Sequence, residues 1–164
     1  MVTHLKTKSI ESFQIDHTRL LPGVYVSRVD HAGEAPVTTY DIRMKRPNLD
    51  FPLSTGAAHT IEHLGATYLR RHTDASVIYF GPMGCRTGFY LILSGQPDLL
   101  KTLSLVEQMM IFIAKADAVP GATKEECGNA RDHDLIGARA EAIRYLEELD
   151  QISSEADARL HYPE

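Results

Sequence analysis

The chain has 164 residues, a length typical of one domain, and 43% of them are apolar, which is enough for a packed core. The formal net charge is −5, there is no tryptophan, and the basic residues form no stripe, so nucleic acid is not expected as a partner. No apolar run is long enough to cross a bilayer, and the first residues lack the apolar core of a signal peptide. We therefore expect a cytoplasmic, soluble protein without a membrane partner, folded as a single domain over residues 1–164.

Patterning along the chain predicts four strands. Two β-rich runs, residues 23–31 and 37–46, come first, and two more, 75–80 and 86–94, flank the turn "GPMG". Strands that follow one another along the chain favour antiparallel pairing.

Three stretches have apolar residues at helical spacing: residues 56–72, 97–116 and 132–150. Ser54 or Thr55 could cap the first, and Pro97 fits the first helical position of the second. Residues 119–129 should form a loop with at most one helical turn. Together the elements predict an α+β fold, in which an antiparallel sheet of about four strands is covered by helices.

The first predicted helix contains "HTIEHL", which places His59, Glu62 and His63 in an H-x-x-E-H arrangement. Apolar residues such as Ile61 and Leu64 share one helix face, and both histidines lie nearly opposite. Two histidines at i and i+4 can reach one metal ion from successive turns, and a neighbouring carboxylate can move a proton. The alternative is a solvated helix face in a chain that has eight histidines.

Two histidines do not complete a catalytic zinc or ferrous centre, which usually has three protein ligands and an open position. H-x-x-E-H is also the signature of inverzincin metallopeptidases, whose third ligand is a downstream glutamate, so Glu125 or Glu126 is one possibility. Cys127 follows them directly, and its thiolate would favour Zn(II) or Fe(II) over harder ions. The spacing alone leaves this choice open.

The chain has one other cysteine, Cys85, in the glycine-rich bend "GPMGCRTGFY". In a reducing compartment a structural disulfide with Cys127 is not expected. Arg86 follows directly, and a cation beside a thiol can lower its pKa and suit it to proton transfer. The alternative is a buried structural cysteine at the start of a strand, with Arg86 pointing outward.

Four segments together, "SFQIDHT", "HTIEHL", "GPMGCRTGFYL" and "ECGNARDHDL", resemble the LuxS family of S-ribosylhomocysteine lyases, and "TYDIR" also fits. The resemblance implies an iron(II)-dependent carbon–sulfur lyase, active also with Zn(II) or Co(II). Such an enzyme converts S-ribosyl-L-homocysteine to L-homocysteine and 4,5-dihydroxy-2,3-pentanedione. The dione is the precursor of an autoinducer used in quorum sensing, and the homocysteine re-enters the activated methyl cycle.

The resemblance also implies roles for individual residues. His59, His63 and Cys127 would bind one metal ion per subunit, which favours the thiolate over the neighbouring glutamates. Glu62 and Cys85 would be the general acid/base pair. The family is homodimeric, with active sites at the subunit interface.

Three further positions match residues that line the substrate site in the family: Ser12, His17 and Arg43. The chain departs from the family between His72 and Gly81, where it is shorter than usual, and Gly81 itself often corresponds to serine. Neither difference touches a metal ligand or acid/base residue that the resemblance implies.

Two other functions compete with the lyase. An inverzincin-type metallopeptidase would use a glutamate, not Cys127, as its third ligand. A metal-binding or sensory module without turnover would have a closed metal site with four protein ligands.

Overall fold

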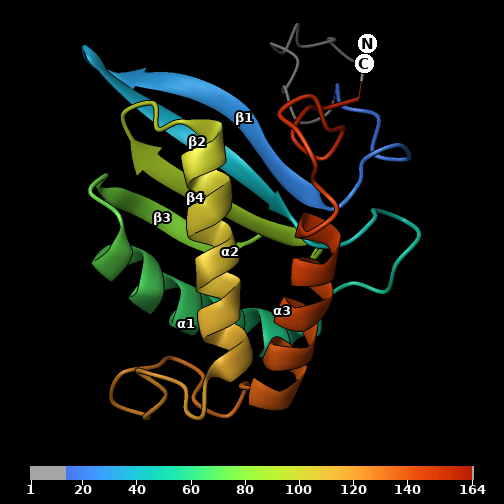
Figure 1. Cartoon of the computed structure of the whole chain (residues 1–164). Coiled ribbons are helices and arrows are strands. Elements are labelled where there is room, and N and C mark those ends of the chain that lie inside the picture. The colour runs from blue at the N-terminus through green and yellow to red at the C-terminus, as the bar shows by residue number, and fades with distance from the viewer. Residues whose placement is uncertain (1–13, 164) are drawn as a thin grey trace, which may run out of the picture.

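The structure, a computed structural model, describes residues 14–163 and contains four strands and three helices (Figure 1). In chain order these are β1 (Gly23–Ala32), β2 (Ala35–Arg43), α1 (Thr55–His72), β3 (Val77–Pro82), β4 (Gly88–Ser94), α2 (Leu99–Lys115) and α3 (Leu135–Leu149). The strands form one sheet in the order β1-β2-β4-β3, and every neighbouring pair is antiparallel. The predicted α+β class, with a four-stranded antiparallel sheet covered by helices, is confirmed.

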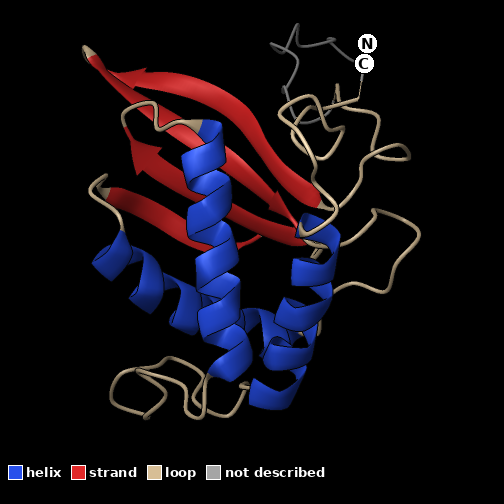
Figure 2. Ribbon diagram, in the orientation of Figure 1, coloured by secondary structure: helices blue, strands red, loops and turns tan. Residues whose placement is uncertain are grey.

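The helices gather on one side of the sheet (Figure 2). Side chains alternate between the two faces of a strand, so Tyr40 and Ile42 of β2 point into the helix-covered core, where both are fully buried. Asp41 and Arg43 lie on the opposite face of the same strand and are also buried. The sheet therefore separates an apolar layer under the helices from a polar group on its other face.

Strand β2 ends at Arg43, whereas the sequence pattern predicted a strand that continues to residue 46. The backbone amides of Met44 and Lys45 both donate to the Thr87 carbonyl, at 3.0 Å. Two successive amides that share one acceptor cannot continue a strand ladder, so the chain leaves the sheet here.

The helix starts show which capping predictions hold. Ser54 caps α1, because its Oγ accepts from the Ala57 amide at 3.1 Å. Pro97 does not begin α2; the carboxylate of Asp98 accepts from the amides of Leu100 and Lys101 and caps that helix instead. Of the helices in the described part of the chain, none is both long enough and apolar enough to span a membrane.

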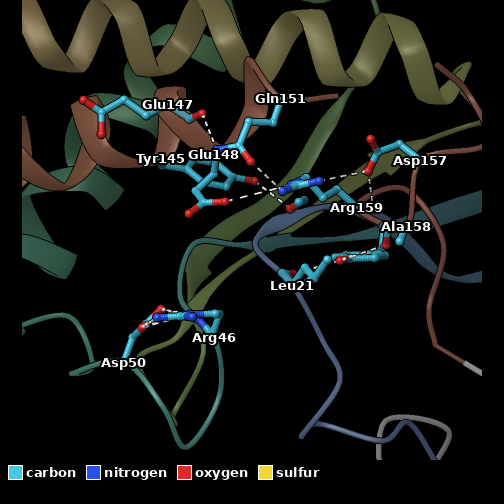
Figure 3. Close-up of polar contacts among 12 residues, drawn as sticks. Leu21, Arg46, Asp50, Tyr145, Glu147, Glu148, Gln151, Asp157, Ala158 and Arg159 are labelled. Atoms are coloured by element: carbon cyan, nitrogen blue, oxygen red, sulfur yellow. Dashed lines mark hydrogen bonds and ion pairs between the residues drawn. The ribbon is translucent and has the colours of Figure 1, made fainter. Parts of the chain in front are cut away.

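The segment after α3 returns to β1 and holds it in place (Figure 3). The Val24 amide donates to the Arg159 carbonyl at 3.0 Å, and the buried Tyr145 hydroxyl donates to the Gly23 carbonyl at 2.6 Å. The Arg159 guanidinium in turn donates to Gln151 Oε1 at 2.7 Å and pairs with Asp157 at 3.4 Å. The C-terminal segment thus stabilises β1, a strand at the edge of the sheet.

Close packing between α1 and β3 depends on Gly65. A Cβ at this position would lie 2.4 Å from Cε1 of Phe80 and 3.1 Å from Sδ of Met109. The Phe80 ring is buried and stacked on Phe89 at 5.1 Å, so it has little room to move.

We predict that Gly65→Ala lowers the free energy of unfolding by about 1–3 kcal/mol, because overpacking outweighs the roughly 1 kcal/mol that alanine gains in a helix. Urea denaturation measures the change. Gly84→Ala is the control, since a Cβ there meets no atom within 4 Å. A Gly65→Ala variant as stable as the parent would contradict this account of the α1–β3 contact.

Candidate metal centre and thiol site

The first half of α1 presents His59 and His63 on one side, with their rings edge-to-face at 4.7 Å. Nδ1 of His59 lies 2.8 Å from the Asp132 carbonyl, and Nδ1 of His63 lies 2.9 Å from the Pro120 carbonyl. A carbonyl can only accept, so each Nδ1 carries the hydrogen and each Nε2 keeps a free lone pair. This is the usual arrangement behind imidazoles that ligate metals.

The loop between α2 and α3, the orange segment in Figure 1, completes the group. It brings Cys127 and His133 to the two histidines of α1, and the four potential ligand atoms lie within 4.8 Å of one another. Cys127 Sγ is 3.4 Å from Nε2 of His59, close to the roughly 3.6 Å expected between sulfur and nitrogen ligands of a tetrahedral ion. The donor set and spacing therefore fit a borderline-soft divalent metal ion.

Hydrogen bonds to the start of α1 hold this loop in place. The Asp134 amide donates to Thr60 Oγ1 at 2.9 Å and approaches the Gly56 carbonyl at 3.2 Å. Thr55 Oγ1 donates to Asp132 Oδ1 at 3.1 Å. The backbone carbonyls that orient the histidines thus belong to a segment bonded to the same helix.

A single turn places the cysteine within the loop. The Thr123 carbonyl accepts from the amides of Glu126, at 3.2 Å, and Cys127, at 2.9 Å, although no regular helix forms between residues 119 and 129. The Glu126 carboxylate accepts from Thr123 Oγ1, and the metal group found in residues 14–163 includes neither Glu126 nor Glu125. The loop presents sulfur, and not a carboxylate, to the histidines.

His133 was not among the residues that the sequence singled out. Its ring stacks on that of His59 at 4.1 Å, and its Nε2 lies 3.7 Å from Cys127 Sγ. Burial lowers the pKa of His133, and the neighbouring His59 and His63 lower it further. The only sequence signal was its place six residues after Cys127, in "ECGNARDHD".

Glu62, the carboxylate of the motif, is half-buried on α1 next to His63 and is not part of the metal group. Within residues 14–163 its carboxylate has no hydrogen-bond or ion-pair partner.

The thiol of Cys85 lies in the turn between β3 and β4. Its Sγ is 3.1 Å from Thr87 Oγ1 and 4.0 Å from Nη1 of Arg43. The Arg43 guanidinium is buried, donates to both oxygens of Asp41 at 2.6 and 3.1 Å, and donates to Thr87 Oγ1 at 2.5 Å. Arg86, the cation expected beside this thiol, instead donates to the Leu53 carbonyl at 3.0 Å. The arginine beside the Cys85 thiol is therefore Arg43, and the expectation that Arg86 would take this place was wrong.

These contacts change the acidity of the thiol. Partial burial raises the pKa of Cys85, but hydrogen bonds from Thr87 and the positive charge of Arg43 lower it by more, so the net pKa is below its usual value. Cys85 is exposed, not buried as the structural alternative required. The result is an accessible thiol with an increased thiolate fraction.

A cavity of about 320 Å³ opens beside this thiol and brings together three of the predicted site residues: His17, Arg43 and Cys85. Nδ1 of His17 bonds to the Ile15 carbonyl at 2.9 Å. None of the metal-group residues lines this cavity, and Ser12 lies outside the described residues.

An α+β domain that combines an imidazole–thiolate metal group with a separate thiol of lowered pKa has the features of a metal-dependent enzyme. Residues 10–156 match the model of the family described as S-ribosylhomocysteinase (LuxS). Relatives named S-ribosylhomocysteine lyase occur in Desulfotalea psychrophila, with 48% identity over 95% of this chain and 99% of the relative, and in Phocaeicola vulgatus, with 48% identity over 95% and 98%. The relative of that name from Clostridium acetobutylicum is 47% identical over 96% of this chain and 99% of the relative. The chain belongs to the LuxS family.

We predict that Thr87→Val slows alkylation of Cys85 at pH 7 by about three- to tenfold, because losing the hydroxyl donor raises the thiol pKa. Peptide mapping after timed iodoacetamide labelling, repeated across pH, measures the rate of Cys85 alone. Thr39→Val is the matched control, since the buried Thr39 hydroxyl has no hydrogen-bond partner in the described structure. An unchanged pH profile for Thr87→Val would remove Thr87 from the control of this thiol.

Proposed function

We propose that the chain cleaves S-ribosyl-L-homocysteine to L-homocysteine and 4,5-dihydroxy-2,3-pentanedione, by carbonyl migration followed by β-elimination. The observation that carries this proposal is the pairing of a histidine–thiolate metal group with an accessible, acidified thiol in a chain of the LuxS family. A hydrolytic metal site needs no such thiol.

We propose His59, His63 and Cys127 as the ligands of one Fe(II) ion per subunit, with Zn(II) or Co(II) as substitutes. The fixed tautomers of both histidines and the sulfur–nitrogen distance of 3.4 Å support this set. When bound, the ion would supply Lewis-acid stabilisation of the negative charge that develops on a sugar oxygen during enolisation.

Cys85 is the group we assign to the carbonyl-migration steps. The thioether sulfur leaves only from a carbon β to a carbonyl, so the aldehyde of the open-chain sugar must first move from C1 to C3. Each shift removes a proton from the carbon next to the carbonyl and returns one to the former carbonyl carbon. A thiolate that the Arg43 cation and the Thr87 hydroxyl stabilise can take the first proton and, as a thiol, deliver the second.

Glu62 is the group we assign to the elimination. Its carboxylate would remove the C4 proton of the 3-ketone, the C5–sulfur bond would break, and homocysteine would leave as a thiolate that takes up a proton. The enol that remains tautomerises to the dione, so no external oxidant or reductant is needed. The absence of a partner for Glu62 within residues 14–163 supports its role as a base.

The substrate contacts are assigned to Ser12, His17 and Arg43. His17 and Arg43 line the cavity beside Cys85, which supports this assignment. Because Asp41 and Thr87 already occupy most of the Arg43 guanidinium, its main task in this proposal is to stabilise the Cys85 thiolate next to the sugar.

We further propose a homodimer with active sites at the subunit interface. The loop from β2 to α1 links the Arg43 cavity to the histidine-bearing helix, and its tip exposes Leu49 (69%) and Phe51 (93%). Ile136, at the start of α3, is 83% exposed. A second subunit that buried these side chains would cover the entrance to both groups of site residues.

A cytoplasmic location suits this chemistry, because both Cys85 and Cys127 must remain reduced. The dione would serve autoinducer production, and the homocysteine would serve the activated methyl cycle. The competing metallopeptidase would place a glutamate against the histidines, where the structure has Cys127.

The first test is thiol release from S-ribosylhomocysteine by anaerobically purified protein, with metal content measured on the same sample. We predict that Cys85→Ala and Glu62→Ala each lose activity by at least about 10²-fold while retaining one metal equivalent. Cys127→Ala should lose both the metal and the activity, because a ligand is gone.

His72→Ala is the control, since among residues 14–163 this exposed histidine of α1 bonds only to the Tyr68 carbonyl and stacks on the Tyr68 ring. Normal turnover by Cys85→Ala or Glu62→Ala would remove that residue from the mechanism. Full metal content in Cys127→Ala would refute the ligand set, and cleavage of a generic peptide without thiol release would favour the metallopeptidase.

The dimer leads to a separate prediction. Sedimentation should give about twice the chain mass of 18.3 kDa, and Phe51→Glu should shift the protein to the monomer with reduced lyase activity but unchanged metal content. Leu100→Glu, on the exposed start of α2, is the control and should remain dimeric. A monomeric parent with full activity would contradict the shared active site.

A further inference from the structure

We propose that His133 is a positioning residue that donates a hydrogen bond from its Nε2–H to the Cys127 thiolate, and is not a fourth metal ligand. The inference rests on the ligand set proposed above. It decides whether the four-residue group is a closed site or a site with three protein ligands and an open position.

Distance alone does not separate the two roles. Nε2 of His133 is 3.7 Å from Cys127 Sγ, which suits an N–H···S hydrogen bond and also suits two ligands of one tetrahedral ion. The answer lies in which ring nitrogen of His133 carries the hydrogen.

Thr60 decides this. Its hydroxyl is completely buried, and its oxygen already accepts from the Asp134 amide at 2.9 Å. In this buried position the hydroxyl hydrogen needs an acceptor, and among the described residues the only remaining hydrogen-bond partner of the hydroxyl is Nδ1 of His133, at 3.2 Å, so the hydroxyl donates to Nδ1. Since Nδ1 accepts, a neutral His133 must carry its hydrogen on Nε2.

The two α1 histidines show the opposite arrangement. Nδ1 of His59 and of His63 each face a backbone carbonyl, which forces the hydrogen onto Nδ1 and leaves Nε2 free to bind a metal. Of the three histidines, only His133 has its Nδ1 against a hydroxyl, which can donate its own hydrogen to that nitrogen. Two carbonyls of the α2–α3 loop therefore leave the α1 imidazoles as ligands, and a hydroxyl of α1 leaves the His133 imidazole as a donor.

This arrangement has a consequence for the site. With a metal ion bound, a hydrogen bond from His133 would withdraw electron density from the Cys127 sulfur and so strengthen the Lewis acidity that the site supplies. A His133 that donates to sulfur would not itself be a ligand, so three protein residues would hold the ion. The His133 ring stacks on the His59 ring at 4.1 Å, and this contact restricts rotation of the donor imidazole.

The direct test is two-dimensional ¹H–¹⁵N NMR of the imidazoles in the zinc-loaded wild-type protein, which needs no variant. We expect His133 to show a protonated Nε2 and an unprotonated Nδ1, while His59 and His63 show a protonated Nδ1 and a metal-bound Nε2. A metal-bound Nε2 on His133, or a proton on its Nδ1, would overturn the inference. If His59 and His63 lack metal-bound nitrogens, the proposed ligand set fails independently of the result for His133.

Cobalt spectroscopy gives a second readout. Co(II)-loaded His133→Phe should still bind one ion, about 10- to 100-fold more weakly, and its thiolate-to-cobalt absorption should move to longer wavelength because sulfur has lost a donor. His133→Gln, whose amide can replace the Nε2–H, should move it back towards the wild-type position, and His72→Phe should leave it unchanged. An unshifted band in His133→Phe would contradict the donor role.

Discussion

The docking of the α2–α3 loop on the first turns of α1 is the constraint on which the metal group depends. Cys127 and His133 are more than sixty residues away from His59 in the chain. They reach it because the Asp134 amide bonds to Thr60 and the Asp132 carbonyl bonds to the His59 ring. The same bonds that hold the loop also set the imidazole tautomers, so packing and ligand chemistry are fixed together.

The sheet separates the apolar core from the polar residues around the Cys85 thiol. Helix-covered positions of β2, such as Tyr40 and Ile42, form the core, and the alternate positions carry Asp41 and Arg43. Arg43 connects this second face to Cys85, in a cavity that none of the metal-group residues lines. The proposed reaction uses both the thiol and the metal group, and the exposed apolar tip of the β2–α1 loop supports the proposal that a second subunit completes the site.

The sequence predicted the secondary-structure elements and the histidine pair on α1 because both depend on local spacing. The i, i+4 histidines, the alternating strands and the Ser54 cap each repeat a short-range pattern. It missed His133, because nothing in the spacing of "RDHD" shows that the loop folds back onto Thr60. It chose Arg86 over Arg43 as the cation near Cys85, because cross-strand neighbours are invisible until the register of β2 and β4 is known. Both His133 and Arg43 reach their positions through contacts between residues far apart in the sequence, which local patterns do not show.

In the proposed reaction this chain breaks a carbon–sulfur bond by elimination and not by hydrolysis. The most direct measurement is the product balance when the anaerobic, metal-loaded protein acts on S-ribosylhomocysteine. Elimination predicts one equivalent of 4,5-dihydroxy-2,3-pentanedione for each equivalent of homocysteine, with no free ribose. Homocysteine accompanied by ribose, or no thiol release at all, would contradict the account.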